Sequence, residues 1–263
     1  MRLRRTQFSM KNLSSLSALV AAVVVSALPS SARAEGPGNA DERALRYASP
    51  QRFALEFRLG TYNPEVDSEP SLGGKTPFAT TFGEKPPRFL PSVEFDWQAL
   101  RIPHFGSIGP GYGVGYTSFS AAARKLDGTG TSSQDTSLEI VPMYLVGVLR
   151  IDVLANELKF PLVPYVKAGV GLGLWRAYSP NGTTSSNGVA GKGFTFGTHL
   201  AVGAAIQLDF LERDHARALD DSIGINHTYL FGELFWSNLR GLGQDNVMYV
   251  GAKAWTLGLA MEF

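Results

Sequence analysis

Charged residues that could bind ions or form a buried network occur at alternate positions in several otherwise apolar segments. Glu56 and Arg58 are two positions apart, as are Glu94 and Asp96. In a β-strand, residues two positions apart point to the same face of the sheet. The residues predicted to share an inward face in this way are Glu56, Arg58, Glu94, Asp96, Lys167 and Glu233.

If the strands close into a barrel, these six side chains meet in its interior. Two interpretations follow. The charges either form a paired network that fills the lumen, or they line a narrow path for an ion or solute. Glycines that alternate with apolar residues near Gly113, Gly171 and Gly258 would leave room for water or a small solute, so the second interpretation stays open.

The sequence predicts no catalytic, cofactor-binding or metal site. The acidic residues Glu65, Asp67 and Glu69 lack the spacing of a calcium-binding loop. The histidines are scattered and none lies in a recognisable Ser/His/acid signature: His104, His199, His215 and His227. A barrel enzyme centred on His199 or His227 is nevertheless kept as the alternative class of protein.

The segments that would position the charges alternate between apolar and polar residues, which is the pattern of half-buried strands. Such alternation predicts eight strands: Phe53–Tyr62, Phe89–Leu100, Gly109–Ser120, Thr136–Asp152, Val163–Trp175, Phe194–Phe210, Ile223–Trp236 and Val247–Phe263. The fourth strand is apolar on both faces around residues 143–149, so its inward face is not evident from the sequence.

The connections between these strands also alternate in character. Those after strands one, three, five and seven are polar and mostly long, whereas the others are shorter on average. Long outer loops and short inner turns are typical of membrane barrels. We therefore predict an all-β fold, an eight-stranded antiparallel up-and-down transmembrane β-barrel with both termini on the inner side.

Residues 1–34 have the parts of a secretory signal peptide: a basic start, an apolar stretch over residues 13–28, and the small-x-small sequence Ala32-Arg33-Ala34. We expect a flexible periplasmic lead-in over residues 35–52 and the barrel over residues 53–263. Removal of the signal takes away five basic residues and leaves 19 basic against 23 acidic residues, a net charge of −4 that disfavours nucleic acid as a partner. The absence of cysteine excludes a lipoprotein anchor and thiolate metal sites.

No segment after the signal reaches the roughly 18 unbroken apolar residues of a spanning helix, so we expect the chain to cross a membrane as strands. Aromatic belts are predicted near both ends of the strands. The outer belt would contain Tyr62, Phe89, Phe119, Trp175, Phe194 and Trp236, and the inner belt Trp97, Phe210 and Phe263.

The final strand resembles the C-terminal assembly signal of outer-membrane proteins, in which alternate apolar residues precede a terminal phenylalanine. The matching residues are Trp255, Leu257, Leu259, Met261 and Phe263. In strand number and loop asymmetry the chain resembles small outer-membrane barrels of the OmpA, OmpX and OmpW type. Its opening, FALEFRLGTYNPEVD over residues 53–67, resembles a functionally uncharacterised family of outer-membrane barrels of myxobacterial type.

These resemblances imply a fold and a cellular location but no activity. We expect an outer-membrane barrel with a structural or surface-interaction role, or a narrow pore; the alternative is a barrel enzyme that acts on outer-membrane lipid. The expected partners are outer-membrane lipid, lipopolysaccharide and the barrel-assembly machinery, with no nucleic acid and no cofactor. The sequence does not indicate which partner the outer loops bind.

Overall fold

The computed structural model describes residues 52–83, 88–124, 130–158, 160–179, 182–186, 189–208, 225–244 and 247–263. The predicted signal peptide and residues 35–51 of the predicted lead-in lie outside these ranges, as do Phe210 and His215.

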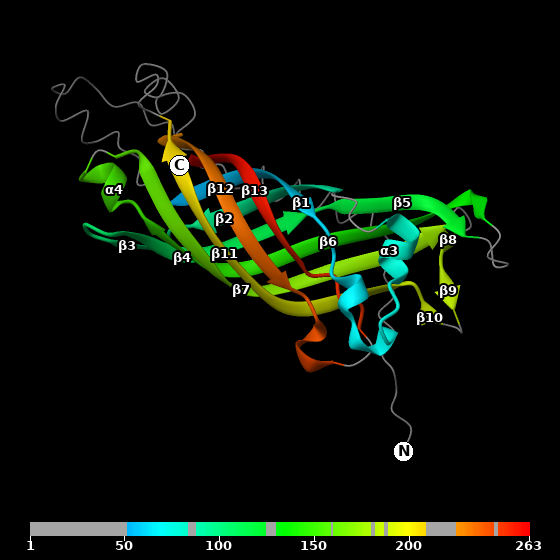
Figure 1. The fold of residues 1–263 in the computed structure, drawn as a ribbon. Coiled ribbons are helices and arrows are strands. Elements are labelled where there is room, and N and C mark those ends of the chain that lie inside the picture. Colours follow the sequence, from blue (N-terminus) through cyan, green and yellow to red (C-terminus); the bar gives the residue numbers. More distant parts are fainter. Residues whose placement is uncertain are drawn as a thin grey trace, which may run out of the picture. The chain divides into compact units, whose positions relative to one another are not determined.

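Antiparallel strands form a closed barrel (Figure 1). Each barrel strand pairs with the next, and the first also pairs with the last, which closes the cylinder. Within the described residues the barrel strands number eight, as the sequence predicted, because β4 and β5 are parts of one strand interrupted at Tyr116. The strands are β1 (Phe53–Tyr62), β2 (Arg88–Trp97), β4 (Gly106–Gly115) with β5 (Thr117–Arg124), β6 (Thr131–Ile151), β7 (Leu162–Ser179), β11 (Lys192–Gln207), β12 (His227–Asn238) and β13 (Ala252–Glu262).

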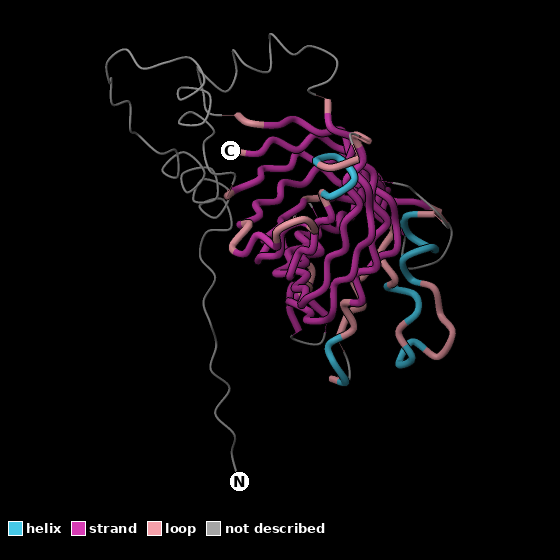
Figure 2. The backbone as a smooth tube through the Cα atoms, turned by 90° about the vertical axis from the view of Figure 1, so that its left-hand side faces the viewer, coloured by secondary structure: helices cyan, strands magenta, loops and turns pink. Residues whose placement is uncertain are grey.

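Short elements lie at both ends of this wall, which Figure 2 shows in magenta. One end, called here the α3 end, carries η1 (Val66–Ser68), η2 (Pro70–Leu72), α3 (Pro77–Phe82), β8 (Gly182–Thr183), β9 (Ser185–Ser186), β10 (Val189–Ala190) and η3 (Gly241–Gly243). The other, the α4 end, carries β3 (Leu100–Ile102), α4 (Val153–Asn156) and the C-terminus. None of the helices in the described part of the chain has both the length and the apolar content that crossing a membrane requires.

The two faces of the wall are inverted relative to those of a water-soluble protein. On β1, Phe57 and Leu59 are 48% and 57% exposed, whereas Glu56 and Arg58 are only 1% and 4% exposed. The same alternation continues around the barrel, where the outward residues of β11, β12 and β13 are mostly apolar. Because strand residues alternate strictly between the faces, one apolar residue in two is sufficient to make the outer wall apolar.

The predicted strand bounds are wrong at both ends of the barrel: β2 ends at Trp97 and not at Leu100, and β12 begins at His227 and not at Ile223. The eighth strand was predicted to begin at Val247, but β13 begins at Ala252. Residues before it cross the barrel mouth instead, where the backbone N–H of Val250 donates to the carbonyl of Leu239 at 3.2 Å and Thr195 donates to the carbonyl of Met248 at 2.8 Å. Burial of Val250 accounts for the difference.

The predicted outer aromatic belt is correct only in part. Phe89, Phe194 and Trp236 are exposed on the outer wall. Tyr62 and Phe119 are instead fully buried, and Trp175 packs against the same apolar cluster. These three rings lie on the inward faces of their strands, because Tyr62 alternates with Arg58, Phe119 with Gly113 and Trp175 with Lys167. The period of two therefore already placed them inward, and the predicted outer belt did not apply it at the strand ends.

Inward aromatic rings occupy the space above inward glycines. Tyr144 lies directly across from Gly113, and a β-carbon on Gly113 would overlap its ring. Three further directly opposed pairs repeat this arrangement: Tyr165 with Gly203, Trp175 with Gly193, and Phe231 with Gly258. Leu239 and Val250 cover Gly171 and Gly173 in the same way. At Gly113, Gly171 and Gly258 side chains therefore take the space that was expected to hold solvent, whereas Gly115, on the same strand as Gly113, lines a small cavity.

Substitution of Gly113 by alanine tests this filling of the lumen. Displacement of the Tyr144 ring should lower the free energy of unfolding by about 1 to 3 kcal/mol, as overpacking does elsewhere. The measurement is urea unfolding of the refolded chain in detergent. Gly147→Ala on β6 is the matched control, because the nearest atom to its β-carbon is 3.9 Å away. Equal losses in the two variants would contradict the role given to Tyr144.

Candidate functional site

The structure brings all six predicted inward charges together in the middle of the lumen. None of them is more than 4% exposed. They come from four strands: Glu56 and Arg58 from β1, Glu94 and Asp96 from β2, Lys167 from β7 and Glu233 from β12. Neighbouring strands supply most of the acidic groups, and β7 supplies the lysine from a part of the wall that does not pair with them.

Arg58 links three strands of the barrel, β1, β2 and β12. Its Nη1 donates to Glu56 Oε2 at 2.9 Å and to Glu94 Oε2, and its Nη2 donates to Glu233 Oε1. A guanidinium group suits this position because its donors are fixed in a plane and can contact several carboxylates at once.

Lys167 binds the same three carboxylates from the opposite side. Its Nζ lies 2.6 Å from Glu94 Oε1, 3.0 Å from Glu56 Oε2 and 3.2 Å from Glu233 Oε2. The ammonium group also lies 4.8 Å from the centre of the Tyr165 ring, and the Arg58 guanidinium 5.4 Å from that of Phe231. Two rings that fill the space above glycines therefore also contact the cations that bridge the lumen.

Arg150 is a member of this network that the sequence did not reveal. Its Nη2 donates to Glu56 Oε1 at 2.6 Å and to Asp96 Oδ2 at 2.7 Å. It lies on β6, the strand that is apolar on both faces, so no alternation marked it as inward. Tyr144, from the same strand, donates to Glu94 at 2.5 Å and was missed for the same reason.

We call these residues together the central charge cluster: Glu56, Arg58, Glu94, Asp96, Arg150, Lys167 and Glu233. Toward the α4 end, Glu262 extends it, accepting from Gln98 at 2.6 Å and from Tyr229 at 2.9 Å. Glu262 could have been found from the sequence, because it lies on the face of β13 opposite to the apolar residues.

Three carboxylates of the central charge cluster are close enough to share a metal ion, but their neighbours include two of the protein's own cations, and Asp96 Oδ1 has no hydrogen-bond partner among the described residues. Carboxylate oxygens of Glu56, Glu94 and Asp96 lie within 4.8 Å of one another, which is close enough to share a cation. The positions facing them are taken by Lys167 and Arg150, whose nitrogens lie at hydrogen-bonding distance from these oxygens. The protein's own cations therefore supply the positive charge that these carboxylates require when buried.

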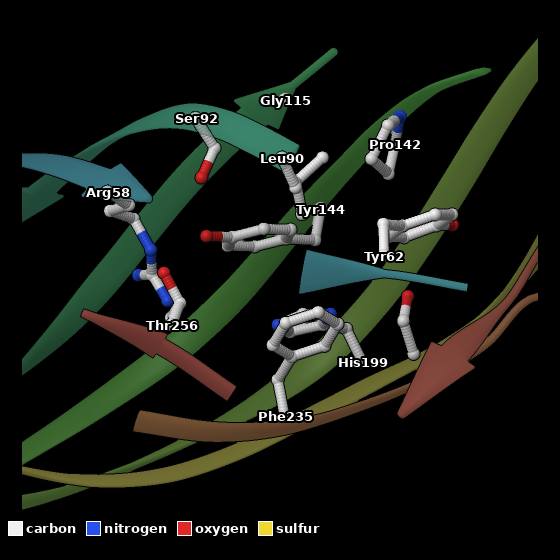
Figure 3. Close-up of a pocket in the computed structure, with 11 residues that line it drawn as sticks. Arg58, Tyr62, Leu90, Ser92, Gly115, Pro142, Tyr144, His199, Phe235 and Thr256 are labelled. Atoms are coloured by element: carbon white, nitrogen blue, oxygen red, sulfur yellow. The ribbon is translucent and has the colours of Figure 1, made fainter. Parts of the chain in front are cut away.

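A small cavity lies between the central charge cluster and the α3 end (Figure 3). His199 lines it, with its ring stacked 4.0 Å from that of Tyr144 and 5.9 Å from that of Phe235. About 20 Å³ is accessible to the centres of water molecules, which is room for one or two waters. Neither ring nitrogen of His199 hydrogen bonds to a described residue, so a water molecule here would satisfy them.

The known contacts of the two histidines of the enzyme alternative are with aromatic rings for His199 and with Gln207 for His227. A nucleophile, a base and an orienting group must lie within hydrogen-bonding reach of one another. The flat sides of the His199 ring are covered by aromatic rings, and neither of its nitrogens hydrogen bonds to a carboxylate of the described residues. His227 Nδ1 lies 3.0 Å from the side-chain amide of Gln207.

An apolar cluster, called here the α3-end plug, borders this cavity at the α3 end. Its buried residues come from the barrel strands and from the loops that cross the mouth: Tyr62, Val66, Phe78, Leu90, Phe119, Leu138, Ile140, Ala201, Phe235, Leu239, Val250 and Ala252. Phe78 of α3 packs edge-on against Phe119 of β5 at 5.0 Å.

Two of the acidic residues considered for calcium binding hold these loops in place. The Asp67 carboxylate accepts from the backbone N–H groups of Phe78 and Ala79, both at 2.7 Å, at the start of α3. Glu65 accepts from Arg240 Nη2 at 2.7 Å and thereby ties the first loop to the last.

The residues of the predicted C-terminal assembly signal line the outward face of β13. Trp255, Leu257 and Leu259 are each about half exposed, while Met261 and Phe263 are partly buried. Recognition of this face by the assembly machinery stays a prediction.

A closed antiparallel sheet, an apolar outer wall and a charged interior define this protein as a small up-and-down β-barrel of the outer-membrane type. No protein-family model and no curated protein sequence matches the chain.

Several solved structures of small outer-membrane barrels resemble it. OprG of Pseudomonas aeruginosa is 11% identical, with 81% of this chain and 96% of that chain covered and a TM-score of 0.48. Ail, the attachment invasion locus protein of Yersinia pestis, in complex with a heparin analogue, is 10% identical over 81% and 97% of the two chains, with a TM-score of 0.41. The N-terminal barrel domain of P. aeruginosa OprF is 10% identical over 81% and 98%, with a TM-score of 0.37. The resemblance of residues 53–67 to the myxobacterial family stays a prediction.

Removal of the Lys167 charge tests how much the central charge cluster contributes to the free energy of unfolding. Lys167→Met keeps the length of the side chain but leaves three carboxylates with one fewer cation, so the free energy of unfolding should fall by about 3 to 5 kcal/mol. Urea unfolding in detergent measures the loss. The double variant Lys167→Met with Glu233→Gln should recover part of it, since one carboxylate is removed as well.

Lys253→Met is the control, because the Lys253 side chain is 65% exposed and its Nζ lies 3.8 Å from Glu65. An exposed pair of this kind contributes at most about 1 kcal/mol. If the two lysine variants were equally stable, the cluster would have no special weight.

Proposed function

We propose that this chain is an outer-membrane β-barrel with a closed lumen, whose role is structural or depends on contacts made by its outer surface. The observation that carries the proposal is the pair of bridges made by Arg58 and Lys167. These side chains come from β1 and β7 and bind the same three carboxylates in the middle of the lumen.

The outer wall supports the membrane location. In lipid every backbone N–H and C=O must be paired within the sheet, and a closed barrel meets that requirement. A charge near the bilayer midplane destabilises a barrel by roughly 2 to 4 kcal/mol. The outward residues along the middle of β11 and β13, among them Leu200, Val202, Leu257 and Leu259, carry none.

Export and assembly complete the proposal. Residues 1–34 would act as a signal peptide, residues 35–52 as a periplasmic lead-in, and residues 53–263 as the barrel. The outward face of β13, ending at Phe263, would present the assembly signal to the barrel-assembly machinery. The α4 end then faces the periplasm and the α3 end faces outward, in contact with outer-membrane lipid and lipopolysaccharide.

Three successive layers support a closed lumen rather than a narrow pore. The α3-end plug closes the outer mouth, the central charge cluster bridges the middle, and Gln98, Tyr229 and Glu262 hydrogen bond near the inner mouth. A path for ions would require displacement of loop residues and separation of buried ion pairs, and breaking one such pair is strongly unfavourable.

The membrane location can be tested with the tryptophans, because they point in opposite directions. Trp255 is 49% exposed on the outer wall, whereas Trp175 faces the α3-end plug. Two variants should each retain one of these residues, with the other three tryptophans changed to phenylalanine. In vesicles with brominated acyl chains, the fluorescence of Trp255 should be strongly quenched and that of Trp175 only weakly. Equal quenching, or none for Trp255, would contradict a lipid-facing outer wall.

The closed lumen predicts an electrically silent barrel. The refolded wild-type chain should produce no conductance steps in planar bilayers, because the cavity near His199 has room for only one or two waters. Insertion is established in parallel by protection of the strands from protease in the same lipid. Discrete ohmic steps from inserted wild-type protein would establish the pore interpretation in place of this one.

A further inference from the structure

Two cations lie side by side on the outer wall, where its apolar surface ends toward the α3 end. Arg176 of β7 and Lys192 of β11 are direct cross-strand partners. Side chains of a strand alternate between the two faces of the sheet. Arg176 is an even number of residues from the outward Val170 of β7, and Lys192 from the outward Phe194 of β11, so both cations lie on the outer face. Like charges directly opposite each other on a sheet are destabilising unless a third group compensates them.

The apolar part of the wall begins immediately below these cations. The next two outward rungs of the same ladder pair Phe194 with Leu174 and Phe196 with Leu172. The phenylalanine rings are 58% and 45% exposed. On the outer face of β7 and β11, two positive charges are thus followed toward the α4 end by two cross-strand pairs of aromatic and aliphatic residues.

Neither of the two cations forms an ion pair with a described residue. Arg176 donates from Nε to the Thr183 hydroxyl at 3.1 Å, and its guanidinium lies 5.6 Å from the centre of the Tyr178 ring. On its other side Arg176 faces Glu139 in register, but Glu139 accepts from the Tyr116 hydroxyl at 3.0 Å and makes no ion pair with it.

We propose that Arg176 and Lys192 form a binding site for the phosphate group of an outer-leaflet glycolipid, with its acyl chains lying along Leu174, Phe194 and Phe196. The site rests on the proposed membrane location, and it names which part of the wall contacts which part of the lipid. A phosphate placed between the two cations removes their mutual repulsion and forms charge-assisted hydrogen bonds with both. The acyl chains of the same glycolipid would contact the apolar cross-strand pairs.

The test compares Lys192→Gln and Arg176→Gln with Lys253→Gln, which removes a charge from a different part of the wall. Lys253 is the matched control because its direct cross-strand partner is Trp236, not a cation. Each refolded protein is titrated in neutral bicelles with bisphosphorylated lipid A. A basic residue near an anionic lipid surface contributes about fivefold in affinity. We therefore expect about fivefold weaker binding for Lys192→Gln and Arg176→Gln, and less than twofold for Lys253→Gln.

A second measurement separates a lipid site from a merely structural role. Without lipid A, Lys192→Gln should unfold at the same or a higher temperature than wild type, because one of two repelling charges is gone. With lipid A it should unfold at a lower temperature than wild type. A variant that is equally destabilised in both conditions would overturn the proposal.

The identity of the ligand is tested by two further titrations of the wild type. Dephosphorylated lipid A should bind more weakly, and inorganic phosphate at the same concentration should not raise the unfolding temperature. Equal binding of dephosphorylated lipid, or equal stabilisation by inorganic phosphate, would overturn a lipid-phosphate site.

The outcome is distinguishable from failure of the proposed function. If Trp255 is quenched by brominated lipid but the three glutamine variants bind lipid A equally, the barrel is in the membrane and only the site is wrong. If Trp255 is not quenched, the membrane location itself is wrong.

Discussion

The structure depends on a set of ion pairs at the centre of a closed sheet. Charges withdrawn from water are destabilising unless opposite charges and hydrogen bonds surround them. Here Arg58 and Lys167 approach the same three carboxylates from different parts of the wall, and Arg150 joins Glu56 to Asp96. The cluster thereby connects strands that are not neighbours in the sheet, β1 and β2 on one side and β7 on the other, across the middle of the lumen.

Glycine and aromatic residues make this arrangement sterically feasible. Large rings fit inside an eight-stranded barrel only where the facing strand has no side chain. Four inward rings lie directly across from glycines, and two of them, Tyr165 and Phe231, also lie against the bridging cations. The glycines are therefore part of the packing of the interior, and the lumen has two small cavities that described residues line.

The α3 end and the outer wall of the barrel differ in the residues that they present. At the α3 end, Asp67 fixes the start of α3 and Glu65 links the first loop to Arg240, so the apolar plug is held by specific contacts. On the outer wall, paired cations at Arg176 and Lys192 mark the boundary where apolar surface ends. The proposed closed lumen leaves the outer wall and the α3 end as the surfaces through which the barrel would contact lipid and partners.

The sequence by itself determined the strand number, the full extent of β1 and the inward direction of six charged residues. These properties follow from a period of two, which is local and is read along a single strand. Only the tertiary structure decided that Arg150 and Tyr144 join the cluster, that residues 247–250 cross the barrel mouth, and that rings fill the space above glycines. Those outcomes depend on register between strands and on the paths of loops across the mouth. Both are set by contacts between residues far apart in the chain, so no local pattern contains them.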